Sequence, residues 1–224
     1  MLDGISALCF DLDDTLWEVG GVIAKADAEV MQFLERRYPR LAGRHNVESL
    51  RAARTRLARA EPDRAHDMTW LRTESLRRLA VAAGDPAHAA EEAFAVFIEH
   101  RNRVELYADV LPALGRLAAR FKLATLSNGN ADLRRIGLQS LFAVSLSAGE
   151  IGVAKPDPRA FSSVADRLGI APREMAYVGD DPLNDVQGAR AAGWRTVWVN
   201  RRRQPWPAGH APPDVSVSDL SELG

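Results

Sequence analysis

The feature that most constrains the fold of this chain is a series of short apolar segments separated by helical patterns. The apolar segments lie at 5–10, 123–126, 143–146, 175–178 and 196–199. A short apolar run bounded by polar residues is typical of a buried parallel strand. Helical patterns lie between these segments, at 110–121, 158–168 and 185–192. Strands that alternate with helices predict an α/β fold with a Rossmann-like, doubly wound parallel sheet.

The segment between residues 17 and 107 has a different pattern, without a convincing strand. It is rich in Ala, Leu, Arg and Glu, and helices are expected at 47–60, 70–83 and 87–103. We therefore predict a core domain formed by residues 1–16 and 108–224, with an all-helical cap domain, 17–107, inserted after the first strand. Residues 201–213 are rich in Pro and Arg and are expected to form a loop before a short strand at Val215.

Composition excludes several partner classes. The net charge is −1, so no overall positive field attracts nucleic acid. No stretch approaches the roughly 20 apolar residues of a membrane helix, and we expect no membrane partner. The first residues lack the pattern of a signal peptide, and the single cysteine excludes an internal disulfide. We expect a cytoplasmic protein that acts on a small molecule, and the sequence indicates no obligatory protein partner.

The first apolar segment ends at an acidic cluster that contains Asp11 and Asp13. In an extended chain, residues two apart point to the same side, so these carboxylates can share a site. Two close carboxylates repel each other unless a cation or a shared proton relieves them, which favours a metal site or a nucleophile and acid pair. A surface turn is the structural alternative. A calcium loop is excluded because Leu16 and Val22 stand where that loop needs Gly and Glu.

Two further clusters could bind an anion. Ser127, Asn128 and Gly129 follow the second apolar segment, and a hydroxyl with free amides at a helix start suits an anion. Their structural alternative is a helix N-cap with a glycine turn. Lys155 precedes a rigid Pro-x-Pro segment and could neutralise a phosphate beside Asp11. Its structural alternative is an exposed lysine before an ordinary proline helix start.

The fourth cluster follows the segment 175–178 and contains three acids, Asp180, Asp181 and Asp185. Carboxylates in one strand-to-helix loop suit a hard divalent cation. The alternative is a helix N-cap provided by Asp185 or Asn184. Since all four clusters follow apolar segments, a parallel sheet would gather them at the carboxyl edge, where ligands bind in open α/β folds.

In their order and content, the four clusters resemble the motifs of the haloacid-dehalogenase superfamily. Asp11, Asp13 and Thr15 match its D-x-D-x-T motif, and Ser127 and Lys155 match its second and third motifs. Asp180 and Asp185 match the acids of its fourth motif, and the resemblance includes the helical cap, which corresponds to the type inserted after the first motif.

The resemblance implies a role for each motif. Asp11 would attack phosphorus and form an aspartyl-phosphate, while Asp13 would act as general acid and then as general base. Mg²⁺ would be held by Asp11, the backbone carbonyl of Asp13 and Asp180, with Asp185 in support. The remaining implied phosphate-binding residues are Thr15, Ser127, Asn128, Gly129 and Lys155.

The implied activity is a Mg²⁺-dependent phosphomonoesterase acting on small soluble phosphometabolites. A 2-haloacid dehalogenase is the less favoured alternative, since family dehalogenases lack the second acid that Asp13 provides here. A phosphomutase, which shares Asp13, stays open, and so does an inactive phosphate-binding protein. A response-regulator receiver does not fit, because its acidic pair precedes its phosphorylated Asp and it has no inserted cap.

Substrate choice is expected to depend on the cap. Trp17 could stack on a ring or a sugar, or it could be a core residue at the cap hinge. His66 and Arg72 lie in or next to an unusually polar cap stretch and are candidate specificity residues. This stretch, with 127–131 and 178–181, is similar to bacterial phosphatases of FMN and of 5-amino-6-(5-phosphoribitylamino)uracil. FMN, riboflavin-pathway phosphates, nucleoside monophosphates and sugar phosphates are the candidate substrates.

Overall fold

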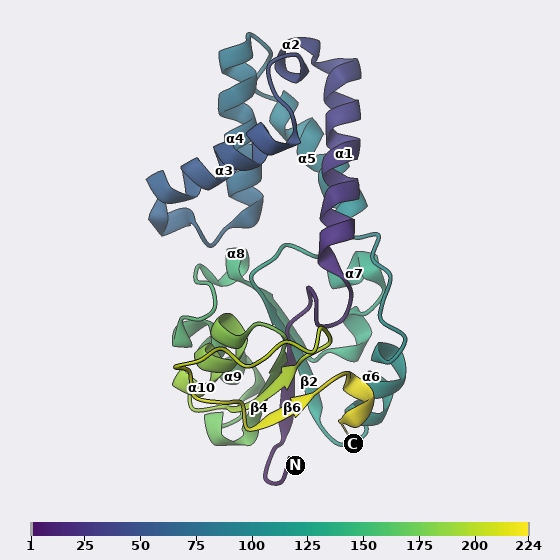
Figure 1. Ribbon diagram of the computed structural model, residues 1–224, viewed down its shortest axis with the longest axis vertical. Coiled ribbons are helices and arrows are strands. Elements are labelled where there is room, and N and C mark those ends of the chain that lie inside the picture. Colours follow the sequence, from purple (N-terminus) through teal and green to yellow (C-terminus); the bar gives the residue numbers. More distant parts are fainter. Residues whose placement is uncertain (1, 224) are drawn as a thin grey trace. The chain divides into compact units, whose positions relative to one another are not determined.

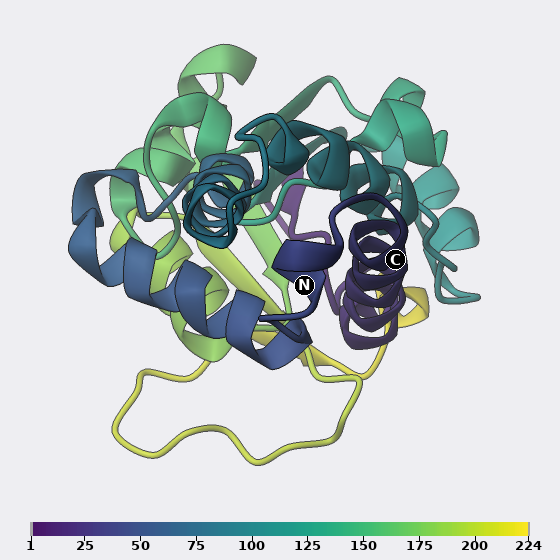
Figure 2. The same ribbon diagram turned by 90° about the horizontal axis from the view of Figure 1, so that it is seen from above.

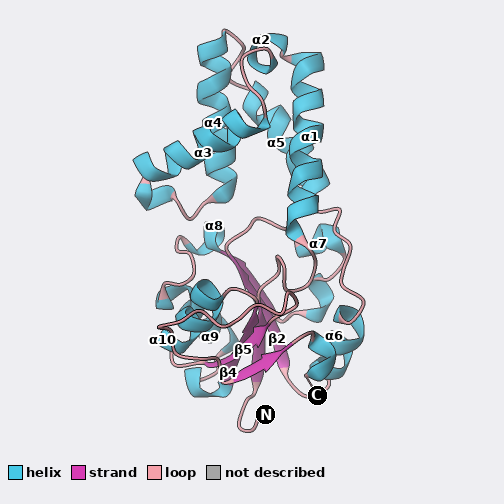
Figure 3. Ribbon diagram, in the orientation of Figure 1, coloured by secondary structure: helices cyan, strands magenta, loops and turns pink. Residues whose placement is uncertain are grey.

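The computed structural model describes residues 2–223 and contains a six-stranded parallel sheet (Figure 3). The strand order is β3-β2-β1-β4-β5-β6. The strands are β1 Ala7–Phe10, β2 Lys122–Ser127, β3 Val144–Ser147, β4 Met175–Gly179, β5 Arg195–Val199 and β6 Val215–Val217. The predicted fold class is therefore confirmed, and each predicted strand corresponds to one of these.

Strand β1 lies at the centre of the sheet, between β2 and β4. All four of its residues are buried, as expected for a strand that is covered on both faces. The chain winds outward from β1 in one direction to β2 and β3, and in the other direction to β4, β5 and β6. The gap between β1 and its neighbours at the carboxyl edge is thus a topological switch point, the usual ligand position in such sheets.

Helices cover both faces of this sheet (Figure 1). Helix α9 coincides with the predicted helix 158–168 and ends at Gly169, whose φ of 65° is the left-handed conformation favoured by glycine. The predicted helix 185–192 is instead a π-helical turn, η4 Pro182–Gln187, followed by a short α-helix. The α-helices of the core are α6 Val110–Ala118, α7 Leu133–Ile136, α8 Ala148–Ile151, α9 Pro158–Leu168 and α10 Gly188–Ala191.

One face of the sheet packs against α9 and α10 through a single apolar core. Alternate residues of the strands point into it, for example Ala7 and Cys9 of β1, as the period of two requires. The rings of Phe161, Tyr177 and Trp194 meet edge to face or tilted at this core, with centroids 5.1 to 6.4 Å apart. This packing holds the strands in place and therefore also positions the residues that follow their carboxyl ends.

The helical segment forms a second compact unit with its own apolar core, around α1 and α5. Its helices are α1 Val19–Arg37, α2 Pro39–Ala42, α3 Val47–Ala60, α4 Met68–Ala83 and α5 Ala89–Arg101. The sequence did not resolve α1, because the charged Asp27 falls among its buried positions Ala26, Val30 and Leu34 and interrupts the apolar stripe.

The chain separates into two units whose limits lie close to those predicted. The first unit comprises residues 1–18, 105–129 and 133–224, and the second comprises 19–104 and 130–132. The predicted cap limits, 17 and 107, differ from these by two or three residues at each crossing. Entry and exit are paired within the first unit, where Trp17 forms an antiparallel bridge with Leu106.

Between β5 and β6, residues 200–214 form the predicted loop, without helix or strand (Figure 2). Arg201 fixes the start of this loop by donating to the Thr15 carbonyl and to both carboxylate oxygens of Asp109. Within residues 2–223, none of the helices is long and apolar enough to cross a membrane.

Candidate active site

A cavity of about 200 Å³ opens at the carboxyl edge of the sheet, at the switch point beside β1. It receives side chains from the loops that follow β1, β2 and β4 and from the segment after α8. Its lining residues are Asp11, Asp13, Asp14, Ser127, Asn128, Gly129, Lys155, Asp180, Asp181, Asn184 and Asp185. The structure thus brings together residues from all four sequence clusters, although Asp11 and Lys155 are 144 positions apart.

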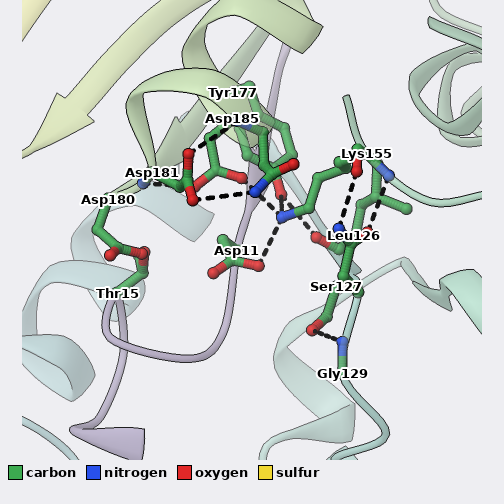
Figure 4. A network of polar contacts seen from close by, with 12 residues as sticks. Asp11, Thr15, Leu126, Ser127, Gly129, Lys155, Tyr177, Asp180, Asp181 and Asp185 are labelled. Carbon is green, nitrogen blue, oxygen red and sulfur yellow. Dashed lines mark hydrogen bonds and ion pairs between the residues drawn. The ribbon is translucent and has the colours of Figure 1, made fainter. Parts of the chain in front are cut away.

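The ammonium group of Lys155 lies at the base of this site, with three partners (Figure 4). Its Nζ donates to Asp11 Oδ1 at 2.6 Å, to Asp185 Oδ1 at 2.7 Å and to Tyr177 Oη at 2.6 Å. Lys155 is buried, so these contacts replace its hydration. They raise the pKa of Lys155, against the effect of burial, and keep it positively charged.

Asp11 is almost completely buried at the end of β1, and its amide donates to the carbonyl of Val178 in β4. Burial raises the pKa of the Asp11 carboxyl well above its ordinary value, and Lys155 opposes this by favouring the charged form. The nearby carboxylates of Asp185 and Asp180 raise it further. The site therefore has an excess of negative charge that a cation would relieve.

Asp11, Asp180 and Asp185 form a cation-binding arrangement. Each offers a carboxylate oxygen, and these three oxygens lie within 4.8 Å of one another. Burial, and then repulsion by Asp185, raise the pKa of Asp180 to about 7. Thr15 donates to Asp180 Oδ1 at 3.1 Å, so it supports this carboxylate and does not line the cavity itself. An all-oxygen, anionic donor set of this kind suits a hard divalent cation.

Asp13 lines the same cavity, two residues after Asp11. Its Oδ1 accepts a 2.9 Å hydrogen bond from the indole nitrogen of Trp17, and Trp17 is fully buried. The backbone closes the same turn, since the amide of Asp14 donates to the Trp17 carbonyl. Trp17 thus orients Asp13, and its contact with a substrate stays a prediction.

The second cluster forms the opposite wall. Ser127 is buried at the end of β2, where its Oγ accepts from the amide of Gly129. Asn128 and Lys155 hold each other by two hydrogen bonds: the Lys155 amide donates to Asn128 Oδ1, and Asn128 Nδ2 donates to the Lys155 carbonyl. The Asn128 side chain therefore joins the second cluster to the third and holds the backbone of Lys155 in place.

The fourth cluster is shaped by a helix cap, but the capping residue is Asp181. Its side chain accepts from the amides of Leu183 and Asn184, which are the second and third residues of η4. The predicted alternative caps were Asp185 and Asn184. Asp185 is instead turned inward, with one oxygen on Lys155 and the other accepting from the Asp181 amide.

A glycine is required at the end of β4. A Cβ atom on Gly179 would lie 2.2 Å from Asp185 Oδ2, which is far inside any real contact distance. The buried Asp185 carboxylate therefore packs directly on the backbone of Gly179. The spacing of glycine and the last acid in this cluster follows from that close approach.

Two residues that support the site were not identified from the sequence. Tyr177 is buried in β4; it accepts from Lys155 and donates to the Leu126 carbonyl at 2.6 Å. Trp198 of β5 donates its indole hydrogen to the Asp180 carbonyl at 2.8 Å. In sequence both are aromatic residues in apolar strands, which is the ordinary pattern of core residues. The available signal was that each carries a polar group that must be satisfied when buried.

The predicted cap residues lie in the second unit. His66 is half-buried in the turn between η1 Pro62–Arg64 and α4. Arg72 is buried in α4, where its Nη1 donates to Asp27 Oδ1 at 2.7 Å. Neither residue is among those that line the cavity at the carboxyl edge of the sheet, and their roles in specificity stay predictions.

The fold and the four clusters agree with the protein family that the sequence matches. Residues 5–193 match the model of the haloacid dehalogenase-like hydrolase family. The chain belongs to this family, and the prediction of a hydrolase of the superfamily is confirmed.

Among its relatives, the 5-amino-6-(5-phospho-D-ribitylamino)uracil phosphatase YigB of Escherichia coli is 32% identical, covering 99% of this chain and 96% of the relative. The phosphoserine phosphatase of Thermus thermophilus is 44% identical over 63% of this chain and 59% of its own length. A crystal structure of 2-haloacid dehalogenase from Pseudomonas syringae is 37% identical, with a TM-score of 0.92, covering 98% of this chain and 96% of that one.

Proposed function

We propose that this protein is a Mg²⁺-dependent phosphomonoesterase of small phosphometabolites. The observation that carries the proposal is that Asp11 and Asp13 line one cavity. Asp180 and Asp185, which complete the cation-binding arrangement with Asp11, line the same cavity. A phosphoester needs a nucleophile, a proton donor for the leaving alcohol and neutralisation of phosphate charge. Each of these requirements has a matching group at this edge of the sheet.

The donor set fits Mg²⁺, which prefers hard oxygen ligands. Asp11, Asp180 and Asp185 would supply carboxylate oxygens, and the carbonyl of Asp13 would be the further ligand that the family resemblance implies. When bound, Mg²⁺ neutralises phosphate charge and polarises phosphoryl oxygens.

The side chains of this chain then have separate tasks. Asp11 supplies the attacking oxygen, and its carboxylate forms a bond to phosphorus as the ester oxygen departs. Asp13 gives its proton to that departing oxygen, and it then takes a proton from the water that hydrolyses the aspartyl-phosphate. Lys155, held 2.6 Å from Asp11, lowers the repulsion between the carboxylate and the phosphate dianion. The Ser127 hydroxyl and the amides beside it are placed to bind phosphate oxygens.

A second candidate function is 2-haloacid dehalogenation, which is favoured by the likeness to the dehalogenase structure from Pseudomonas syringae. In that reaction a carboxylate displaces halide from carbon. Neither a proton donor for an alcohol nor a divalent cation is needed. Asp13, oriented by Trp17, and the carboxylate of Asp180 would then have no task, so the phosphatase is the better supported of the two.

For the substrate, we propose the riboflavin-pathway phosphate named for the Escherichia coli relative, together with FMN. The likeness to that relative extends over 99% of this chain, and thus over both units. Nucleoside monophosphates and sugar phosphates are the further candidates. Cytoplasmic location and the lack of a nucleic-acid or membrane partner stay predictions.

The test is an assay of purified protein with para-nitrophenyl phosphate and FMN, with Mg²⁺ or with EDTA, beside Asp11→Asn. We expect phosphate release that needs Mg²⁺ and that is abolished in Asp11→Asn. A parallel assay measures chloride released from 2-chloropropionate.

The two assays separate the two functions. Chloride release without phosphate release, unaffected by EDTA, would replace the phosphatase by the dehalogenase. Release of neither product by folded protein with Mg²⁺ would reject hydrolysis of these esters and would favour a mutase or a binding protein.

A further inference from the structure

The helical unit contains a second charged cluster, which the proposed reaction does not use. It lies between helices α1, α3 and α4, where the side chains of Asp27, Arg51, Arg54 and Arg72 surround a small cavity. Buried charges are rare unless they are paired or have a function. The buried Arg72, with two further arginines and only one aspartate around the same cavity, therefore requires an explanation.

The single carboxylate of this cluster is fully used by two of the arginines. Asp27 is buried, and its Oδ1 accepts from Arg72 Nη1 at 2.7 Å. Its Oδ2 accepts from both Nε and Nη2 of Arg51, at 2.9 and 2.8 Å. Within residues 2–223, Arg54 has no hydrogen-bond or ion-pair partner, although its side chain is half-buried beside the same carboxylate.

The cluster consequently carries an excess of positive charge. Arg72 is almost fully buried, and its guanidinium lies 3.3 Å from the ring centre of Phe97. Burial, and then the charge of Arg54, lower the pKa of Arg72 to about 10, while Asp27 offsets this only in part. Burial also lowers the pKa of Arg54. One carboxylate thus faces three guanidinium groups, of which Arg72 is buried, Arg54 is half-buried and Arg51 is exposed. For the buried Arg72 an uncompensated charge nearby is costly.

The cavity beside these groups has a volume of about 10 Å³, which is close to the space of one water-sized atom. Its remaining walls are mainly apolar, from Val30, Val47, Leu50 and Leu76. We propose that this cavity is an anion-binding site, in which Arg54 and Arg72 bind a halide ion or one oxygen of a phosphate or carboxylate.

Guanidinium groups suit such a ligand because they present several donors in a fixed plane. The anion has two sources. It could be a free inorganic ion that stabilises the helical unit, or it could be an anionic group of the substrate. Both would bind to the same donors. Only if the anion is a group of the substrate should replacement of Arg54 change KM for that substrate.

The first arm of the test measures thermal unfolding of the whole protein in low-salt buffer, with increasing bromide or phosphate. It compares the wild type with Arg54→Gln and with Arg59→Gln. Arg59 is an exposed arginine on the same helix, α3, so its variant loses the same charge away from the cavity. We expect bromide to raise the Tm of the wild type and of Arg59→Gln, and to raise that of Arg54→Gln much less. Phosphate also binds at the proposed active site in all three proteins, so for phosphate the expected result is a smaller increase in Arg54→Gln than in the other two.

Without added anion, Arg54→Gln is expected to keep or increase the Tm, because it removes repulsion from Arg72. If Arg54 had a purely structural role, its replacement would lower the Tm. Since this arm measures unfolding, it decides the anion site even if the protein hydrolyses no phosphate ester.

The second arm rests on the proposed function and compares para-nitrophenyl phosphate with O-phosphoserine, which carries an additional carboxylate. If the anion belongs to the substrate, Arg54→Gln raises KM for phosphoserine by roughly tenfold or more and leaves that for the nitrophenyl ester unchanged. A loss of anion stabilisation alone supports the free ion. Equal Tm increases in all three proteins, together with unchanged KM values, would overturn the proposal.

Discussion

The three hydrogens of the Lys155 ammonium group all have protein partners, and one of these partners is an uncharged phenol. Asp11 and Asp185 attract the lysine by charge, whereas Tyr177 fixes the direction from which it approaches Asp11. The Tyr177 hydroxyl is itself oriented, because it donates to the Leu126 carbonyl in the neighbouring strand. The position of Lys155 thus depends on the strand pairing of the sheet.

Tyr177→Phe is therefore expected to reduce kcat while changing KM little, since the ammonium group loses its orientation and keeps its charge. The buried Leu126 carbonyl also loses its donor, which should lower the free energy of unfolding by about 1–3 kcal/mol. Steady-state kinetics and urea unfolding measure the two effects. Tyr38→Phe is the control, because it removes a hydroxyl that donates to Glu92 in the helical unit. An unchanged kcat in Tyr177→Phe would contradict the positioning role.

Asp13 provides a prediction that depends on the leaving group. For an alkyl phosphate, Asp13→Asn should lower kcat by roughly 10²–10⁴-fold, because the alcohol needs a proton. For para-nitrophenyl phosphate the loss should be much smaller in the first step, since nitrophenolate leaves without one. Burst kinetics with both esters would show the difference. Trp17→Phe, which removes the donor to Asp13, should show the same preference in weaker form.

At the scale of elements, the turn between β4 and η4 determines whether the carboxylates of the fourth cluster converge. Asp181 caps η4, and the π-helical turn brings Asp185 back over Gly179. The turn thereby brings Asp180 and Asp185, which are five residues apart, together in the cation-binding arrangement with Asp11. A regular α-helix that began at 185 would not produce this arrangement.

Gly179→Ala tests this close approach. The added Cβ would displace the Asp185 carboxylate, so we expect loss of Mg²⁺ affinity and a clear decrease in stability. Mg²⁺ titration by calorimetry and thermal unfolding are the measurements. Gly115→Ala in the middle of α6 is the matched control, because nothing lies within 4 Å of its Cβ position. That control should be neutral or should stabilise the protein by up to about 1 kcal/mol. Wild-type Mg²⁺ affinity in Gly179→Ala would show that the packing is not required.

A helix could be predicted from the sequence where its start signal, its apolar pattern and its end signal agree. Helix α9 has a proline start, a clean apolar face and Gly169 at its end, and it was predicted residue for residue. Helix α1 was not, because Asp27 lies among its buried positions and only the three-dimensional pairing with arginines makes that burial tolerable.

The same reasoning applies to the site. The motif acids and Lys155 stand out as polar residues after apolar strands, and their meeting follows from the parallel sheet. Tyr177 and Trp198 do not stand out, because an aromatic residue in a buried strand has the same pattern whether or not its polar atom meets a functional group. The capping role of Asp181 depends on the π-helical turn, which no local pattern indicated.

At the scale of the whole molecule, the buried acids make stability depend on pH. The pKa of Asp180 is about 7 in the folded protein and near 3.8 when exposed, so between these values the folded state holds a proton that the unfolded state has released. Its contribution to stability is therefore complete below pH 4 and is lost as the pH rises through 7. His45, whose pKa is lowered mainly by burial, acts in the opposite direction near pH 6.5.

We accordingly expect the wild type without Mg²⁺ to lose stability relative to Asp180→Asn as the pH rises from 5 to 8. The comparison cancels His45, which both proteins contain. Urea unfolding in EDTA at several pH values measures the difference. Adding Mg²⁺ should restore stability to the wild type at high pH, because the cation takes the place of the proton. A difference that does not vary with pH would contradict the raised pKa.

The bridge between Trp17 and Leu106, with the bond from the Tyr107 amide to the Leu16 carbonyl, has an evolutionary consequence. It brings the two ends of an 86-residue insertion, 19–104, to neighbouring positions on the first unit. A segment whose ends already meet can be exchanged for another, or for a few linking residues, without re-routing the sheet. Replacing this one segment would leave Asp11, Asp13 and Lys155 in place, because all three belong to the first unit.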